Sequence, residues 1–310
     1  MHKHSRRYLM YIIPVVLLSG CFTGIESTPK ISSKDLHREQ IRISPEEIIL
    51  NGIAPQPFSQ WQPGKEFFVT DTKLEMALDP TSSAVPAAGE IIRYNTWRPV
   101  SSVAGTDDTE ILFTTPSGED LVYRVNATYS DLEKRQRLEI PFTIELSVVD
   151  SVKKRLENQR LYIRNSTWYD STGTHTVRGM KYIPVVIKDV LPGNLVYPVR
   201  IIFESTAPDA PSQASLYMAI DNTKGSRSFA SLFSIADPRN SYPTITEENW
   251  DNIIHSRVAK FMTREECRLA LGSPKSVQRY NAITSLKETW TYDNGIYLLF
   301  DDGILTSFRQ

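Results

Sequence analysis

The stretch Glu288–Phe308, ETWTYDNGIYLLFDDGILTSF, decides the fold of the last part of this 310-residue chain. Three short runs of β-branched and aromatic residues lie in it, at 288–292, 296–300 and 304–308. The first run alternates with a period of two, which is typical of a strand with one buried face. Asn294-Gly295 and Asp302-Gly303 favour tight hairpin turns between the runs. We therefore expect a three-stranded antiparallel meander.

Two short helices are expected before these strands. Thr246 is a suitable N-cap for the first helix, because its hydroxyl can accept a hydrogen bond from a free amide of the first turn. Thr263 and Glu266 have the spacing of a capping box for the second helix. Gly272 provides a left-handed C-cap where that helix ends. Residues 246–310 are therefore predicted to form an α+β unit with the element order ααβββ.

Several motifs of this unit carry a resemblance to a known family. They are Arg257–Thr263 (RVAKFMT), Glu266, Leu271–Pro274 (LGSP), Glu288–Tyr292 (ETWTY) and Tyr297–Gly303 (YLLFDDG). Together they resemble the BamE (SmpA/OmlA) family of small outer-membrane lipoproteins. The resemblance implies two helices against a three-stranded sheet, and a role accessory to β-barrel assembly and envelope integrity. It covers about the last fifth of the chain, and a fold does not dictate a function.

The chain departs from that family's pattern at one place. The family usually shows Gly-Met-Thr where this chain has Phe261-Met262-Thr263, so the backbone freedom of a glycine is lost before the second helix. We take Phe261 and Met262 as candidate partner-binding residues.

From about residue 41 to residue 227 the pattern is β. Short runs of β-branched and aromatic residues alternate with Gly, Pro, Asp and Ser, which is typical of strands and turns. The runs are Glu66–Thr70, Glu110–Thr114, Leu121–Val125, Phe142–Val148, Leu161–Ile163, Tyr182–Ile187 and Val199–Glu204. Pro184 within the sixth run favours an edge position or a bulge. We therefore expect a mainly β protein that ends in an α+β unit.

A weak internal repeat divides the β region in two. Gly89 is followed 24 residues later by Phe113, and Gly179 is followed 24 residues later by Phe203. Extended runs precede both glycines, and a tyrosine-containing strand follows both phenylalanines. Small barrels of the SH3-like kind show this order, so we expect two such β-modules in tandem. Chance similarity between two β-rich stretches is the alternative.

The start of the chain indicates its destination. Basic residues before Tyr8 and an apolar run to Leu18 are typical of a secretory signal, and Arg6-Arg7 leaves the general and the twin-arginine export routes open. Leu18-Ser19-Gly20-Cys21 resembles the bacterial lipoprotein box, which implies a lipid on Cys21. No aspartate follows Cys21, which favours the outer membrane. The alternative is an ordinary signal with a chance cysteine.

These observations predict an order of domains along the chain. It is a signal peptide at 1–20, the lipidated Cys21 and a flexible tether at 21–40, β-modules at 41–150 and 151–227, a connecting helix and hinge at 228–245, and the BamE-like unit at 246–310. Cys267 is expected to be a buried free thiol, because a disulfide with Cys21, the competing possibility, contradicts lipidation.

The composition and motifs of the chain indicate which classes of partner and activity to expect. Lys and Arg number 35 and Asp and Glu number 36, without a basic stripe, so we expect no nucleic-acid partner. No nucleophile elbow, phosphate loop or metal-ligand spacing occurs in the sequence, so we expect no enzyme activity, cofactor or metal. Trp61, Trp168 and Tyr169 lie at expected loop edges, where aromatic rings form partner or glycan platforms or cover small β-cores.

The sequence therefore predicts a non-enzymatic lipoprotein, anchored in the outer membrane by the lipid on Cys21. It would act by contact with an envelope protein, accessory to β-barrel assembly or envelope integrity. The alternative is binding of cell-wall or surface glycans through the β-modules.

Overall fold

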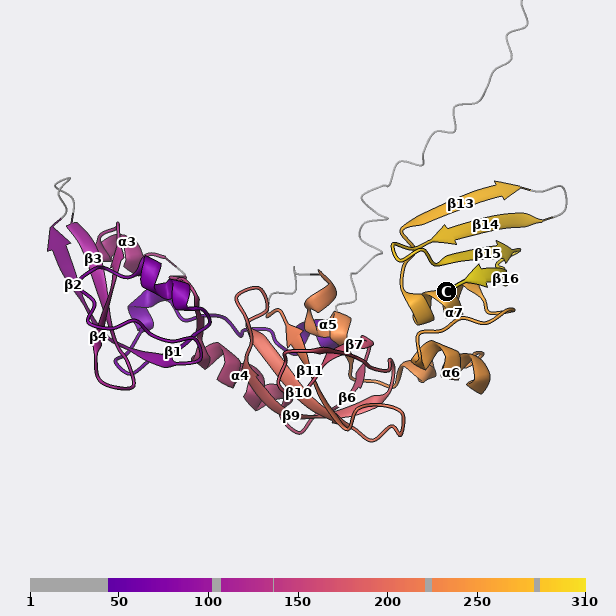
Figure 1. The fold of residues 1–310 in the computed structure, drawn as a ribbon, viewed down its shortest axis with the longest axis horizontal. Coiled ribbons are helices and arrows are strands. Elements are labelled where there is room, and N and C mark those ends of the chain that lie inside the picture. The colour runs from indigo at the N-terminus through magenta and orange to yellow at the C-terminus, as the bar shows by residue number, and fades with distance from the viewer. Residues whose placement is uncertain (1–43, 102–106, 136, 221–224, 282–284) are drawn as a thin grey trace, which may run out of the picture. The chain divides into compact units, whose positions relative to one another are not determined.

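The computed structural model describes residues 44–101, 107–135, 137–220, 225–281 and 285–310, and it is mainly β (Figure 1). Its strands form several sheets, which include a half-barrel. The predicted signal peptide, Cys21 and the tether to residue 40 lie outside the described residues. Within the described ranges, no helix has both the length and the apolar character needed to cross a membrane.

The first sheet has five antiparallel strands in the order β4-β3-β2-β1-β5. They are β1 (Glu66–Val69), β2 (Ile91–Ser101), β3 (Asp107–Thr114), β4 (Asp120–Val125) and β5 (Thr143–Glu145). Short helices accompany them: η1 (Phe58–Gln60), η2 (Thr72–Ala77) and α3 (Tyr129–Glu133). The buried face is rich in aromatic residues, including Phe67 and Phe113, whose rings meet edge to face with centroids 5.5 Å apart. The first sheet therefore has a hydrophobic core that is separate from the cores of the other two sheets.

The second sheet has seven strands in the order β12-β6-β9-β10-β11-β7-β8. They are β6 (Arg160–Ile163), β7 (Thr167–Tyr169), β8 (Thr176–Arg178), β9 (Pro184–Pro192), β10 (Val199–Ser205), β11 (Gln213–Met218) and β12 (Phe233–Ser234). On β10, buried and half-buried residues alternate from Val199 to Ser205, as expected for a strand with one face in the core. The short helices η3 (Gly225–Arg227) and α5 (Phe229–Leu232) precede β12.

The two sheets share one connectivity. Without the β7–β8 hairpin, the second sheet reads β11-β10-β9-β6-β12, which repeats the order β4-β3-β2-β1-β5 of the first. Phe113 on β3 and Phe203 on β10 hold equivalent positions, and both are fully buried. The hairpin is inserted between the first and the second strand of the common pattern. The repeat predicted from sequence thus agrees with the strand order.

The structure corrects two details of the predicted β region. The run 142–148 is a strand only over β5, because the helix α4 (Leu146–Leu156) begins directly after it. Val148, Val152 and Leu156 recur every fourth residue of α4 and are buried, so they form one helix face. Pro184 lies at the first position of β9, which is an interior strand between β6 and β10. A first position tolerates proline, because the missing N–H is not needed there.

The boundaries of the second module also differ from the predicted ones. The strand β12 completes the second sheet, so the segment 228–245 is only partly a connection, with η4 (Pro238–Ser241) following it. In addition, the helix α2 (Pro45–Ile48) belongs here, because Glu46 Oε1 accepts hydrogen bonds from the Ile235 amide and the Ser234 hydroxyl. Leu50 is buried in the same core. The first described residues are therefore part of the second module.

The C-terminal unit has two helices and four strands, one strand more than expected. These elements are α6 (Glu247–Ile254), α7 (Arg264–Leu271), β13 (Ser276–Asn281), β14 (Leu286–Thr291), β15 (Tyr297–Asp301) and β16 (Ile304–Arg309). The predicted N-caps are confirmed: Thr246 accepts from the Asn249 amide, and Thr263 forms a capping box with Glu266. Gly272 ends α7 with a positive φ of 86°, but its ψ of −168° is extended and not the left-handed helical conformation that was expected. All six residues of β13 are exposed, which explains why no hydrophobic pattern marked this strand.

Candidate functional site

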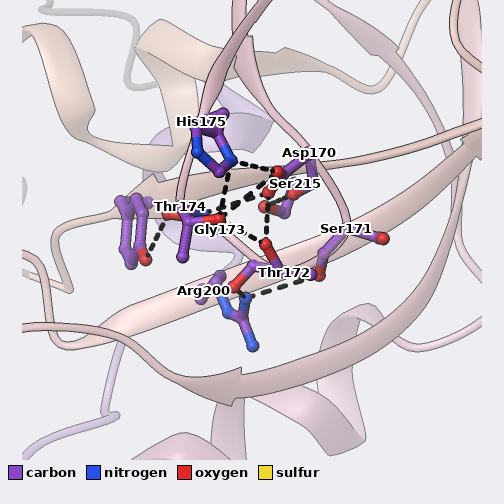
Figure 2. Close-up of polar contacts among 9 residues, drawn as sticks. Asp170, Ser171, Thr172, Gly173, Thr174, His175, Arg200 and Ser215 are labelled. Atoms are coloured by element: carbon purple, nitrogen blue, oxygen red, sulfur yellow. Dashed lines mark hydrogen bonds and ion pairs between the residues drawn. The ribbon is translucent and has the colours of Figure 1, made fainter.

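The loop Asp170–His175 between β7 and β8 is organised around one carboxylate (Figure 2). Asp170 Oδ1 accepts a hydrogen bond from the Thr172 hydroxyl at 2.7 Å and one from the Thr174 amide at 3.0 Å. The His175 Nδ1 atom lies 3.0 Å from Asp170 Oδ2. These bonds, the Thr172 hydroxyl first, hold the pKa of Asp170 well below its usual range, because they favour the charged form.

Three side chains fasten this loop to the second sheet. The Ser215 hydroxyl donates to the Asp170 carbonyl at 2.8 Å, and the Tyr217 hydroxyl donates to the Gly173 carbonyl at 3.0 Å. Arg200 donates to the carbonyls of Ser171 and Thr172 (Figure 2). Gly173 has a φ of +80°, and a Cβ there would lie 2.6 Å from Arg200 Nη1, so a side chain at this position would be strained and would displace Arg200. These contacts therefore tie the loop to β10 and β11 at several points.

The hydrogen bonds of the loop orient the exposed imidazole ring of His175. Its side chain is 83% exposed, and its Nδ1 atom is held by Asp170 and by the Thr174 hydroxyl at 3.0 Å. Within the described ranges, no group of three His, Cys, Asp or Glu side chains is placed to hold a metal ion.

Beside this loop lies a shallow, open depression of about 380 Å³ that we call the tyrosine cavity. Its lining includes Tyr169, Tyr197, Tyr217 and Asn194. The rings of Tyr169 and Tyr217 meet edge to face, with centroids 5.0 Å apart and planes at 86°. Tyr169 was a candidate from sequence. Tyr197 and Tyr217 were not, because neither lies in a motif and only the fold brings them together.

Phe261 is a second candidate surface, separate from the cavity. Its backbone is left-handed, with a φ of 73°, and its side chain is 78% exposed. The backbone around it is nevertheless fixed, because the Phe261 amide donates to the Leu305 carbonyl and the Leu305 amide donates to the Met262 carbonyl, both at 2.8 Å. Ile304, next to Leu305, is also exposed. Phe261 is thus presented at the surface by a well-anchored backbone.

The other candidates from sequence are buried. Trp168 is fully buried, with its indole N–H donating to the Asn165 carbonyl, and Trp61 is buried with its N–H on the Gln56 carbonyl. Met262 is fully buried in the core of the C-terminal unit. These three side chains pack cores, so they are corrected from partner-binding residues to structural ones.

Cys267 is a buried free thiol, as expected. Burial, assisted by the neighbouring Glu266, raises its pKa to about 12. A thiol with such a pKa carries almost no thiolate at neutral pH, so it is unsuited to nucleophilic chemistry.

Comparisons of this chain with protein-family models, with curated proteins and with solved structures found no match.

Proposed function

We propose that this protein is a lipid-anchored, non-enzymatic component of the bacterial outer membrane that acts by contact with another envelope protein. The contact would be made by the C-terminal unit through Phe261. The motifs that resemble the BamE family support a partner within the β-barrel assembly machinery. The lipoprotein box at Cys21 supports the location.

Phe261 carries this proposal, because its position is unfavourable for the isolated fold in two ways. A left-handed conformation costs a residue with a side chain about 1–2 kcal/mol. The exposed ring also forgoes the gain of about 1.5–3 kcal/mol that burial of a Phe side chain provides. Strained residues with exposed apolar side chains are found where a surface meets a partner. A ring that folding does not use is therefore available for binding.

We further propose that the two modules are SH3-like barrels that act as a spacer or as additional binding units. The support is their common strand order, β4-β3-β2-β1-β5 and β11-β10-β9-β6-β12. The second module differs by the inserted β7–β8 hairpin, which contributes Tyr169 to the lining of the tyrosine cavity.

Substitution of Phe261 tests the proposal. Full-length protein, extracted with its membrane partners in mild detergent, should co-purify components of the β-barrel assembly machinery. Phe261→Gly should reduce their recovery at least tenfold, since it removes the ring and suits the left-handed backbone. Met76→Ala is the matched control, because Met76 is another exposed apolar residue, 84% exposed, on η2. Recovery of no assembly component by the unsubstituted protein would remove the assembly-specific role.

Binding of cell-wall or surface glycans through the β-modules is a second candidate function. The tyrosine cavity favours it, because aromatic and polar side chains of the second module, together with Thr70 and Asp71 of the first, line a cavity of about 380 Å³. Pockets for small ligands have volumes of about 300–1,000 Å³.

A further inference from the structure

We infer that the tyrosine cavity binds one or two neutral sugar rings of a saccharide chain. The inference rests on the second candidate function and specifies its site, its residues and its ligand. It does not depend on Phe261 or on the C-terminal unit.

The tyrosine rings offer the kind of surface that a sugar ring needs. One face of a pyranose ring carries several C–H groups with a small positive charge, and an aromatic ring has a negative face. Tyr169 and Tyr217 pack edge to face, with centroids 5.0 Å apart, and both half-buried rings also line the cavity, so a sugar ring can stack on the part of a ring that its neighbour leaves uncovered. The guanidinium of Arg227 lies 5.6 Å from the centroid of Tyr197, which it helps to hold in place.

The cavity is organised before any ligand arrives. The Tyr217 hydroxyl is held by the Gly173 carbonyl, and that loop is in turn held by Asp170, Ser215 and Arg200. Asn194 Oδ1 accepts hydrogen bonds from the amides of Val196 and Tyr197, at 3.0 and 2.9 Å. A site fixed in this way loses little entropy on binding, so weak contacts suffice for measurable affinity.

The polar groups of the lining indicate a neutral ligand rich in hydroxyls. Tyrosine hydroxyls both donate and accept, and the Asn194 amide nitrogen donates, so together they match the hydroxyls of a sugar. The described lining residues contain one carboxylate, that of Asp71, and no Lys or Arg. Among the described lining residues, an anionic ligand would meet the Asp71 carboxylate as the one charged group, and the Arg227 guanidinium is packed over the Tyr197 ring instead of lining the cavity, so the lining favours a neutral saccharide.

Calorimetry with the purified full chain in detergent tests this inference, with maltotetraose and the tetramer of N-acetylglucosamine as probes. At least one probe should bind with a measurable enthalpy. Tyr169→Ala should weaken binding by tenfold or more, whereas Tyr169→Phe should keep most of it, since the ring is retained. Tyr280→Ala is the control, because Tyr280 is an exposed tyrosine on β13 outside the cavity. Thermal unfolding of each variant checks that the second module is intact.

Three results would overturn the inference. The first is that neither probe binds, and the second is that Tyr169→Ala and Tyr197→Ala both bind as well as the unsubstituted protein. The third is that a proline-rich extended peptide binds in a Tyr169-dependent manner and the saccharides do not, which makes the cavity a peptide site. Phe261→Gly should leave saccharide binding unchanged. Failure here is therefore distinguishable from failure of the protein-contact proposal.

Discussion

At the scale of single residues, Phe261 and Asp170 show opposite ways of using the local backbone. Phe261 occupies a conformation that suits glycine and exposes its ring, so its own part of the fold gains nothing from the side chain. The Asp170 carboxylate forms hydrogen bonds with residues of its own loop, and these bonds favour its charged form. We propose that the first residue serves binding, whereas the second holds its own loop together. Each difference can be measured on purified protein.

Backbone strain at residue 261 predicts an order of stability between two variants. Phe261→Gly and Phe261→Ala both remove the ring, but only glycine adopts a positive φ without a steric penalty. Phe261→Gly should therefore unfold at higher urea concentration than Phe261→Ala, by about 1 kcal/mol in free energy of unfolding. Equal stability of the two variants would show that the left-handed backbone carries no strain.

The lowered pKa of Asp170 predicts a dependence of stability on acid. The folded pKa lies below the unfolded value of about 3.9, so the charged carboxylate stabilises the fold at neutral pH. This contribution is present above pH 4 and is lost as the pH falls through the folded pKa. Asp170→Asn should be less stable than the unsubstituted protein at pH 7, and the gap should close below pH 4. Thr172→Val should raise the pKa of Asp170 in an NMR titration, because the Thr172 hydroxyl is the largest cause of the shift. An unchanged pKa would contradict this assignment.

At the scale of elements, a tight packing constraint joins β7 to the turn after β8. Gly179 lies directly against the ring of the fully buried Trp168, which in turn meets Phe203 on β10 edge to face at 5.0 Å. Trp168, which the sequence assigns to a candidate partner-binding platform, is thus a fully buried residue in the hydrophobic core of the second module. The Trp168 indole packs directly on the backbone of Gly179, which helps to bury the indole. The same close approach explains why residue 179 has no side chain.

Gly179→Ala should be strongly destabilising. An added Cβ would lie 2.1 Å from Trp168, so the ring or the backbone must shift, and overpacking of this kind costs about 1–3 kcal/mol or more. Gly118→Ala is the comparison, because Gly118 has a φ of +87° with open space around it and should cost only about 1 kcal/mol. Thermal unfolding measures both. A smaller loss for Gly179→Ala than for Gly118→Ala would contradict the packing described.

Elements that could be predicted from sequence share one property: their signal is local. The capping box at Thr263, the glycine turns and the alternating strand at 288–292 are set by neighbours within a few residues, and all three are found. The strand β13 has no buried residue, so no hydrophobic pattern marks it. The helix α4 starts directly after a strand and has the β-branched pair Val148-Val149 in its first turn, and its four-residue period is visible only beyond Val148.

The candidate site was less predictable, because it depends on long-range pairing. Tyr169 and Tyr217 are 48 positions apart in the sequence, and the pairing of β7 with β11 brings them together. Conversely, Trp168 and Tyr169 are adjacent, but alternation along β7 sends the first into the core. Sequence shows that two aromatic residues occur there, and the strand's orientation decides which one is accessible.

At the scale of the whole molecule, the described part of the chain begins inside the second module. The Glu46 carboxylate and the buried Leu50 dock residues 44–53 on that core, and Arg155 donates to the carbonyls of Ile49 and Asn51 at 2.8 Å. If a lipid on Cys21 anchors the protein, tension from the membrane therefore reaches the second module before the first.

Leu50→Ala should destabilise the second module by about 2–5 kcal/mol, the range for removal of a buried leucine side chain. Ile48→Ala is the control, because Ile48 lies two residues earlier and is about half exposed. Hydrogen exchange should show faster exchange of β6 and β9 in Leu50→Ala, with β2 and β3 of the first module less affected. Equal effects on both modules would contradict the assignment of residues 44–53 to the second core.

The central claim is that the protein acts through contact of Phe261 with another envelope protein. A photo-crosslinking amino acid at position 261, in the full-length protein in living cells, tests it most directly, with the same amino acid at the exposed Met76 as the reference. We predict a discrete crosslink to a component of the β-barrel assembly machinery from position 261 and none from position 76. The same products from both positions, or no product from position 261, would contradict the claim.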